Sequence, residues 1–209
     1  MAFYTNEQWV QWLDRLAEQE FAVIDSFLPD EVLASVRAVL REQQLQQQWQ
    51  PAKVGSATEE VRVAEIRSDF TYWLDIYRDT AARPFFDLVG ELMEQLGQQL
   101  FLSVRGFEFH LAKYPTGGFY KPHLDQFDSR SNRVISFVVY LNEHWQVGDG
   151  GELRIHRAPE PITVAPLMNR AVLFRSDTVL HEVLPASAVR YSLTGWLLKQ
   201  PSSLGVLGL

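Results

Sequence analysis

The sequence contains no cysteine among its 209 residues. Disulfide bonds, iron–sulfur clusters and metal sites built on thiolates are therefore excluded. Any metal ion that this chain binds must be held by histidine and carboxylate side chains. Histidine is scarce as well, since the chain contains only five, at positions 110, 123, 144, 156 and 181. The set of candidate metal ligands is therefore small.

Long apolar runs are also missing. No stretch approaches the roughly 20 apolar residues of a transmembrane helix. The N-terminal segment MAFYTNEQWVQWLDRL lacks the basic flank and apolar run of a signal peptide. We therefore expect a soluble, cytoplasmic protein with no membrane partner.

Positively charged residues are outnumbered, because the chain has 19 lysines and arginines but 26 aspartates and glutamates, which gives a formal net charge of −7. Proteins that bind nucleic acid present a basic surface to the phosphates. We therefore expect no nucleic-acid partner, and an enzyme that demethylates nucleic acid is disfavoured. Hydrophobic residues make up 46% of the chain, which is typical of an ordinary globular protein.

The first hundred residues favour helices, and the second hundred favour short strands. Apolar residues at helical spacing predict helices over residues 6–19, 26–46 and roughly 84–99. Short β-branched and aromatic runs predict strands at residues 21–25, 134–142, 149–155, 161–166, 170–174, 181–185 and 190–198. From residue 103 onward, alternation of apolar and polar residues predicts a further, half-buried strand. We predict an α+β fold with a jelly-roll (double-stranded β-helix) core braced by N-terminal helices.

We predict a single domain over residues 1–209. Residues 1–100 would provide mainly helical support, and residues 101–200 would form the jelly-roll core that carries the site. Residues 50–66 are polar and interrupted by Pro51 and Gly55. A long polar loop of this kind suits a lid that orders when substrate binds.

The triplet His123-Leu124-Asp125 is the first candidate for a metal site. In a strand, residues i and i+2 face the same side, so both side chains can reach one point. His181 opens a later apolar segment and can supply a third ligand. Two histidines and one carboxylate leave three open positions on an octahedral ion, the arrangement of non-haem Fe(II) oxygenases. The alternative interpretation is a set of unrelated polar residues, or a non-catalytic cupin-like sensor module.

Arg190 adds a reason for a small-molecule site. If residues 181–185 and 190–198 pair as antiparallel strands, Arg190 projects into the same barrel. A buried arginine requires a partner, and a carboxylate gripped by two hydrogen bonds is the best one. No acidic residue lies near it in sequence, which favours a carboxylate on a small ligand, with Tyr140 as a second donor. His110, His144 and His156 are interpreted as surface or satisfied structural histidines.

Several segments together resemble a known family. They are IRSDFTYW, AKYPTGGFYKPHLD, RVISFVVYLN, GGELRI and HEVLPASAVRYSLTGW. Their order and spacing are similar to those of the Fe(II)- and 2-oxoglutarate-dependent prolyl 4-hydroxylases. The likeness is to the enzymes that hydroxylate hypoxia-inducible factors and to their bacterial relatives, and it covers roughly residues 20–198.

The resemblance implies roles for particular residues. It makes His123, Asp125 and His181 the iron ligands and Arg190 the partner of the distal carboxylate of 2-oxoglutarate, with Tyr140 bonded to the same group. It also implies two further sets of residues, a cofactor-pocket lining and a substrate-entrance pair. These are Tyr114, Thr194 and Trp196 for the lining, and Asp69 with Arg133 for the entrance.

The resemblance also implies a reaction of the peptidyl-proline 4-dioxygenase type. Fe(II), 2-oxoglutarate and O2 would be required, with ascorbate as an accessory reductant and succinate and CO2 as products. The expected substrate is an exposed proline of a protein, hydroxylated at C4, with elongation factor Tu as the suggested target. The alternative within enzymes is a hydroxylase of free proline or another small metabolite.

Overall fold

The computed structural model describes residues 2–52, 65–126 and 131–199. Its helices are α1 (Asn6–Gln19), α2 (Asp30–Gln46) and α4 (Arg83–Leu100), with a 3-10 turn η1 (Thr80–Ala82). A seven-stranded antiparallel sheet has the order β1-β9-β6-β11-β4-β3-β2, and a four-stranded one has the order β5-β10-β7-β8. The seven strands of the larger sheet are β1 (Phe21–Ile24), β2 (Gln50–Pro51), β3 (Phe70–Trp73), β4 (Gly106–Tyr114), β6 (Arg133–Tyr140), β9 (Ala171–Arg175) and β11 (Arg190–Leu198). The four strands of the smaller sheet are β5 (Tyr120–His123), β7 (Leu153–Ile155), β8 (Ile162–Val164) and β10 (His181–Val183).

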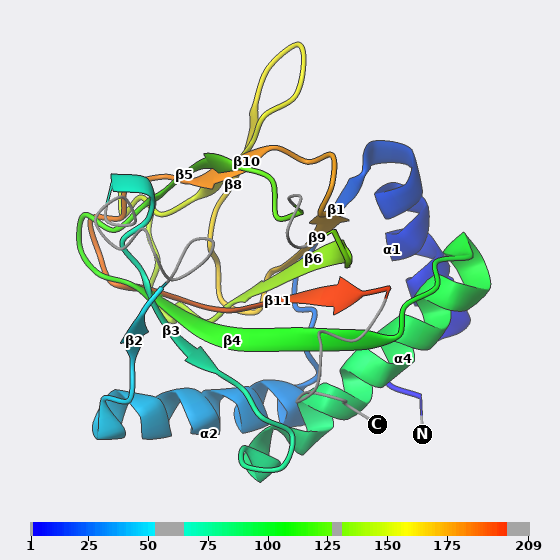
Figure 1. The fold of residues 1–209 in the computed structure, drawn as a ribbon, viewed down its shortest axis with the longest axis horizontal. Helices are drawn as coiled ribbons and strands as arrows, with labels where there is room; N and C mark the ends of the chain where they lie inside the picture. Colours follow the sequence, from blue (N-terminus) through cyan, green and yellow to red (C-terminus); the bar gives the residue numbers. More distant parts are fainter. Residues whose placement is uncertain (1, 53–64, 127–130, 200–209) are drawn as a thin grey trace.

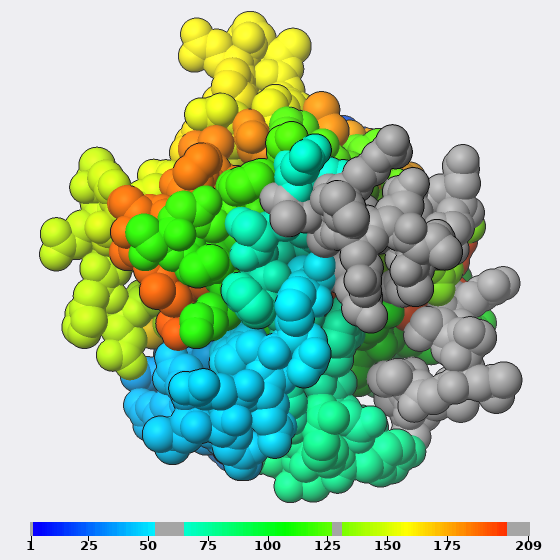
Figure 2. Space-filling model, turned by 60° about the vertical axis from the view of Figure 1, so that its left-hand side comes forward, coloured from blue at the N-terminus to red at the C-terminus, as the bar shows by residue number. Residues whose placement is uncertain are grey.

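The two sheets and the helices form layers (Figure 1). Helices α2 and α4 run beneath the larger sheet, and the smaller sheet lies over its other face. The hairpin between β7 and β8 protrudes from the rest of the surface (Figure 2). This is the α+β, jelly-roll arrangement that the sequence predicts, with N-terminal helices packed against the core. None of the described helices is long and apolar enough to cross a membrane.

The main core lies between the larger sheet and the helices. Phe109 of β4 contacts Phe85 of α4 edge-on, with ring centres 4.9 Å apart, and Phe137 of β6 at 5.7 Å. All three side chains are almost completely buried. Edge-to-face aromatic pairs of this kind add to the free energy gained by burying apolar surface. The helices therefore hold one face of the sheet rigid while the opposite face is left to form a site.

The local sequence explains where α1 begins and which side of the helix is buried. Thr5 and Gln8 form a reciprocal capping box, which satisfies backbone donors at the first turn. The apolar side chains of Trp9, Leu13 and Leu16 recur at helical spacing and are buried. The bounds of α1 coincide with the helix predicted at residues 6–19.

Strand β4 differs from the half-buried strand that its alternation predicts. Phe107, Phe109 and Leu111 face the helices as expected, but His110 and Ala112 on the other face are also buried. Val183 and Tyr120 of the smaller sheet pack near Ala112, and the rings of Trp73 and Trp196 contact His110, and a local pattern reveals none of these contacts. The interpretation of His110 as a surface or satisfied histidine is therefore wrong, because its Nδ1 is buried and has no hydrogen-bond partner.

The antiparallel pairing considered for the two C-terminal strands does not form. Strand β10 pairs with β5 and β7 in the smaller sheet, whereas β11 pairs with β4 and β6 in the larger one. His181 and Arg190 therefore belong to different sheets, although both line one pocket. The two sheets face each other across that pocket, and the barrel shape brings the residues together without a shared hydrogen-bond ladder.

Candidate active site

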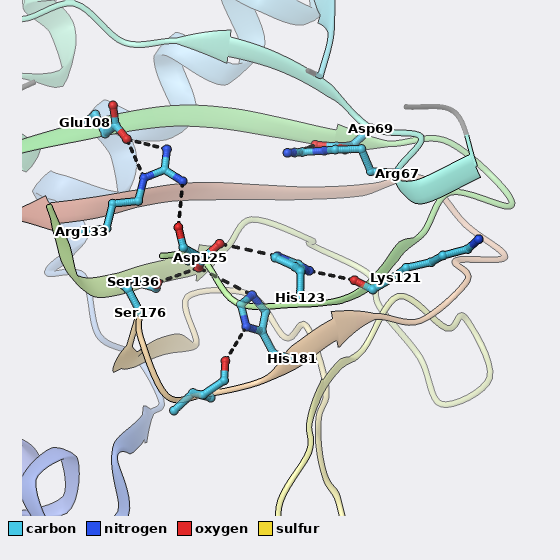
Figure 3. A network of polar contacts seen from close by, with 11 residues as sticks. Arg67, Asp69, Glu108, Lys121, His123, Asp125, Arg133, Ser136, Ser176 and His181 are labelled. Atoms are coloured by element: carbon cyan, nitrogen blue, oxygen red, sulfur yellow. Dashed lines mark hydrogen bonds and ion pairs between the residues drawn. The ribbon is translucent and has the colours of Figure 1, made fainter. Parts of the chain in front are cut away.

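Three side chains converge at one end of the pocket between the sheets (Figure 3). His123 ends β5, Asp125 follows in the adjoining loop, and His181 begins β10 directly opposite His123. One possible ligand atom from each residue lies within 4.8 Å of the other two. The triplet is therefore not a continuous strand, as the spacing suggested, but the turn after β5 still directs Asp125 to the same point.

Both imidazoles are oriented by the backbone. Nδ1 of His123 lies 2.8 Å from the carbonyl oxygen of Lys121, and Nδ1 of His181 lies 3.0 Å from that of Val179. A carbonyl oxygen only accepts, so each Nδ1 carries a hydrogen, and in a neutral imidazole Nε2 then keeps its lone pair. Those two Nε2 atoms point to Asp125, at 3.5 and 3.6 Å from its carboxylate oxygens. This is the arrangement in which neutral histidines bind a metal ion.

Asp125 is held in its ionised form. The hydroxyl of Ser136 on β6 donates to Oδ2 at 2.6 Å, and Ser136 lies 2.9 Å from the hydroxyl of Ser176. Burial alone would raise the pKa of Asp125, but His181, His123 and the Ser136 hydroxyl hold it well below its usual range. Burial lowers the pKa of His181 to about 4. The site therefore presents a carboxylate beside a neutral His181, which is the protonation state that a divalent cation requires.

The opposite end of the pocket contains a buried arginine. Arg190 is 4% exposed and lies over the rings of Tyr114 and Tyr140, at 4.8 and 5.0 Å from their centres. Its Nη1 donates to Ser192, but its Nε and the hydroxyl of Tyr140 have no hydrogen-bond partner. No carboxylate among the described residues pairs with this guanidinium. Burial raises the pKa of Tyr140, so its hydroxyl keeps its hydrogen and can donate it. A buried cation beside an unpartnered hydroxyl fits a small ligand with a carboxylate.

Gly151 makes room for Arg190. A Cβ at this position would lie 2.9 Å from Cδ of Arg190, and the residue has a φ of +72°. Only glycine adopts that conformation at little cost. The GGELRI segment therefore contributes to the pocket through a missing side chain.

The resemblance implies three further residues for the cofactor pocket. Tyr114, Thr194 and Trp196 line the pocket with Arg190 and the three converging side chains. The hydroxyl of Thr194 lies 3.1 Å from that of Ser192, and the indole Nε1 of Trp196 is buried without a partner. The pocket wall on the larger sheet thus contains polar groups that the protein itself does not satisfy.

The predicted entrance pair of Asp69 with Arg133 is wrong. Asp69 instead forms a two-pronged ion pair with Arg67, with N–O distances of 2.7 and 2.6 Å. Arg133 binds Glu108, at 2.8 and 2.5 Å, and the carbonyl oxygen of Asp125. Figure 3 shows the two pairs at separate places on the larger sheet. Most of the predicted lid at 50–66, namely residues 53–64, lies outside the described residues.

Three polar pocket residues were not identified from the sequence. Tyr120 stacks on the ring of His123 with centres 3.5 Å apart, and the guanidinium of Arg67 lies 4.3 Å from the centre of the Tyr120 ring. His110 lines the pocket as well. The sequence did contain a signal for His110. It lies four residues before Tyr114 in the same strand, and residues an even number of positions apart share one face of a strand.

Comparisons with known proteins agree with this geometry. The model of the 2OG-Fe(II) oxygenase superfamily matches residues 109–198. The structure of a Pseudomonas putida prolyl-4-hydroxylase superposes with a TM-score of 0.81 at 35% identity, covering 92% of this chain and 100% of that one. A prolyl hydroxylase from Trichoplax adhaerens, in complex with a hypoxia-inducible factor peptide fragment, has the same fold, with a TM-score of 0.81, 24% identity and 94% of each chain covered.

Curated relatives include the hypoxia-inducible factor prolyl hydroxylase of Caenorhabditis elegans, which is 29% identical over 196 residues, or 87% of this chain. The human prolyl hydroxylase EGLN3 is 36% identical over 91 residues, or 41% of this chain. The matches span only 27% and 38% of the lengths of these two relatives. The match to the whole length of the bacterial structure, and the three converging ligand residues, lead to one conclusion: this chain belongs to the prolyl hydroxylase family of the 2OG-Fe(II) oxygenase superfamily.

Proposed function

We propose that this chain is an Fe(II)- and 2-oxoglutarate-dependent dioxygenase that hydroxylates prolyl residues of a protein at C4. The observation that carries the proposal is the pairing of two features in one pocket. One is a set of two histidines and an aspartate suited to Fe(II), and the other is a buried arginine that has no counter-ion among the described residues. A single pocket that contains both features fits a metal ion and a dicarboxylate bound side by side.

The iron would be held by His123, Asp125 and His181. Three protein ligands leave three positions of an octahedral ion for a co-substrate that binds through two atoms and for O2. When bound, iron and 2-oxoglutarate supply the activation of O2 and the oxidation of a C–H bond, with release of succinate and CO2. The part of the protein is to hold the ligand atoms in place, which the backbone carbonyls and Ser136 support.

Arg190 and Tyr140 would bind the distal carboxylate of 2-oxoglutarate. Both groups are buried, so a hydrogen bond from either one is made where water does not compete. Apolar side chains from both sheets complete the pocket, among them Val138, Phe174 and Val183. A dry pocket of this kind strengthens the charge pair and limits side reactions of the activated oxygen.

The proposed substrate is a proline within a protein. The relatives from Pseudomonas putida and Caenorhabditis elegans are named prolyl hydroxylases, and the Trichoplax enzyme is described in complex with a peptide. In this chain, Tyr120 and Trp196 line the same pocket as the three converging ligand residues. Elongation factor Tu is the target suggested by the likeness to bacterial members of the family.

The test is to map oxygen transfer. Purified protein is incubated with Fe(II), 2-oxoglutarate and ¹⁸O2, together with elongation factor Tu, with lysate proteins and with free proline in separate reactions. We expect succinate and one ¹⁸O atom on a prolyl residue, located at C4 by tandem mass spectrometry. Label found only on free proline would contradict the protein substrate, and label on another side chain would contradict prolyl hydroxylation itself.

A further inference from the structure

His110 is a buried histidine in the pocket wall to which the proposed function gives no role. It is 2% exposed, lines the same pocket as the converging ligand residues, and its Nδ1 has no hydrogen-bond partner. Its ring contacts the indoles of Trp73 and Trp196, with ring centres 4.8 and 5.5 Å away, and the two indoles contact each other at 6.2 Å. These indoles pack against the imidazole ring but leave the nitrogen unpaired.

The chemistry of this imidazole is that of a neutral group. Burial, reinforced by the positive charge of Arg67, lowers the pKa of His110 to about 3. A neutral imidazole has one nitrogen that donates and one that accepts. An unpaired buried nitrogen lowers stability, so its presence in a pocket points to a ligand that supplies the missing partner.

The strand register places His110 away from the proposed carboxylate site. Along β4, Tyr114 lies opposite Arg190, whereas His110 lies opposite Thr194 on one side and Trp73 on the other. Trp73 is 44% exposed, while Arg190 is 4% exposed. His110 therefore lies away from Arg190 along β4, beside the partly exposed Trp73.

The unpaired groups at this side match a peptide unit. Trp196 Nε1 can only donate a hydrogen bond, and it is buried without a partner. His110 Nδ1 accepts one in the tautomer that carries the hydrogen on Nε2. A peptide backbone offers a carbonyl oxygen and an N–H close together, and both are neutral, unlike the carboxylate that Arg190 requires.

We propose that His110 is a specificity-determining residue that accepts a hydrogen bond from the backbone N–H of a residue adjacent to the target proline. The inference rests on the proposed function, because it requires a peptide in the pocket. Proline itself has no N–H, so the donor must be a chain neighbour. Free proline has no such neighbour, and this contact would therefore favour a peptide over the free amino acid.

The test compares two variants and a backbone-modified peptide. His110→Phe keeps a ring in contact with the two indoles but removes both nitrogens, and His110→Asn restores a polar atom near the position of Nδ1. The control is His144→Phe, because the His144 side chain is 91% exposed and lies outside this pocket. The probe is a synthetic peptide centred on the proline that the wild type hydroxylates, made with and without an N-methyl group on each neighbouring residue.

Binding is measured by calorimetry on Fe(II)- and 2-oxoglutarate-loaded protein without O2. We expect His110→Phe to weaken peptide binding about tenfold, as for the loss of one hydrogen bond, with the Kd for 2-oxoglutarate within about twofold of the wild type. N-methylation at one neighbour should weaken binding to the wild type about tenfold but add no further loss in His110→Phe, because both changes remove the same contact. His110→Asn should recover part of the affinity.

Several results would overturn the inference. Equal peptide affinity in His110→Phe and wild type would do so, as would N-methyl peptides that bind the wild type normally. A loss of 2-oxoglutarate affinity instead would assign His110 to the co-substrate. In all three cases the wild type would still hydroxylate the peptide, so the proposed function would stand; a wild type that binds no prolyl peptide would refute both.

Discussion

The two sides of the pocket differ in how fully their polar groups are satisfied. On the side of β5 and β10, both imidazoles have carbonyl partners, and Asp125 accepts from Ser136. On the side of the larger sheet, Arg190, Tyr140, Trp196 and His110 each keep a buried polar atom without a partner. One side is complete within the protein, and the other is not.

This difference separates two kinds of binding. The metal-binding side is preorganised, because its ligands are oriented before an ion arrives. The opposite wall buries polar atoms without partners, which lowers the stability of the free protein, and a bound ligand would supply those partners. Variants on the first side should therefore affect iron, and variants on the second side should affect the organic ligands.

The largest effect is expected from the three ligand residues. His123→Ala, Asp125→Ala or His181→Ala should abolish succinate formation and greatly weaken iron binding, because three ligands are needed to hold the ion with room for co-substrate and O2. Iron content and anaerobic Fe(II) titration measure this, with His144→Ala as the exposed control. Undiminished turnover in any of the three variants would remove that residue from the ligand set.

Arg190→Met should separate the two sides of the pocket. Iron affinity should be retained, but 2-oxoglutarate binding should weaken by about 3 kcal/mol, or roughly a hundredfold in Kd, because a buried charge pair loses one partner. The ligand-free variant should be at least as stable as the wild type, since an uncompensated buried cation has been removed. Calorimetric titration and thermal unfolding give the two numbers. Normal 2-oxoglutarate affinity would contradict the assignment of the carboxylate site.

Ser136→Ala should weaken iron binding and leave 2-oxoglutarate binding intact, the reverse of Arg190→Met, and the effect should be smaller. The variant removes the hydroxyl that orients Asp125, and loss of such a partner typically costs about 10- to 100-fold in metal affinity. The Kd for 2-oxoglutarate at saturating Fe(II) should be nearly unchanged. The matched control is Ser35→Ala, because Ser35 lies on α2, does not line the pocket and donates its hydroxyl hydrogen to the carbonyl oxygen of Val32. Unchanged iron affinity would show that the hydroxyl does not support the ligand.

Tyr140→Phe is expected to have the smallest effect. It removes one hydrogen bond to a charged group, worth roughly 1.5 kcal/mol, or about tenfold in the Kd for 2-oxoglutarate. Iron binding should not change. Because the Tyr140 hydroxyl has no partner in the free protein, the ligand-free variant should lose no stability. A loss of stability without a change in 2-oxoglutarate affinity would refute this role.

Local patterns were sufficient for single elements of this fold. The helix at residues 6–19 and the strand at 190–198 have the predicted bounds, because amphipathic spacing and runs of β-formers are read from neighbouring residues. The three ligand residues could be proposed because only five histidines were available and one lay beside an aspartate. Residue chemistry alone thus limits the metal site to a few side chains.

Contacts between distant segments could not be predicted in the same way. The placement of β10 and β11 in different sheets depends on their partners β5 and β4, which lie far away in the chain. The burial of Ala112 depends on Val183 of the smaller sheet, and the pairing of Arg133 with Glu108 depends on β6 and β4, which both pair with β11. These are properties of the assembled barrel rather than of local sequence.

The most direct test of this account is a crystal structure of the protein with 2-oxoglutarate and Mn(II), an ion that prefers similar oxygen and nitrogen ligands, grown without O2. The account predicts the ion bonded to Nε2 of His123, a carboxylate oxygen of Asp125 and Nε2 of His181. It also predicts the distal carboxylate of 2-oxoglutarate in hydrogen-bond contact with Arg190 and the Tyr140 hydroxyl. An ion bound elsewhere, or a dicarboxylate that leaves Arg190 unpaired, would contradict it.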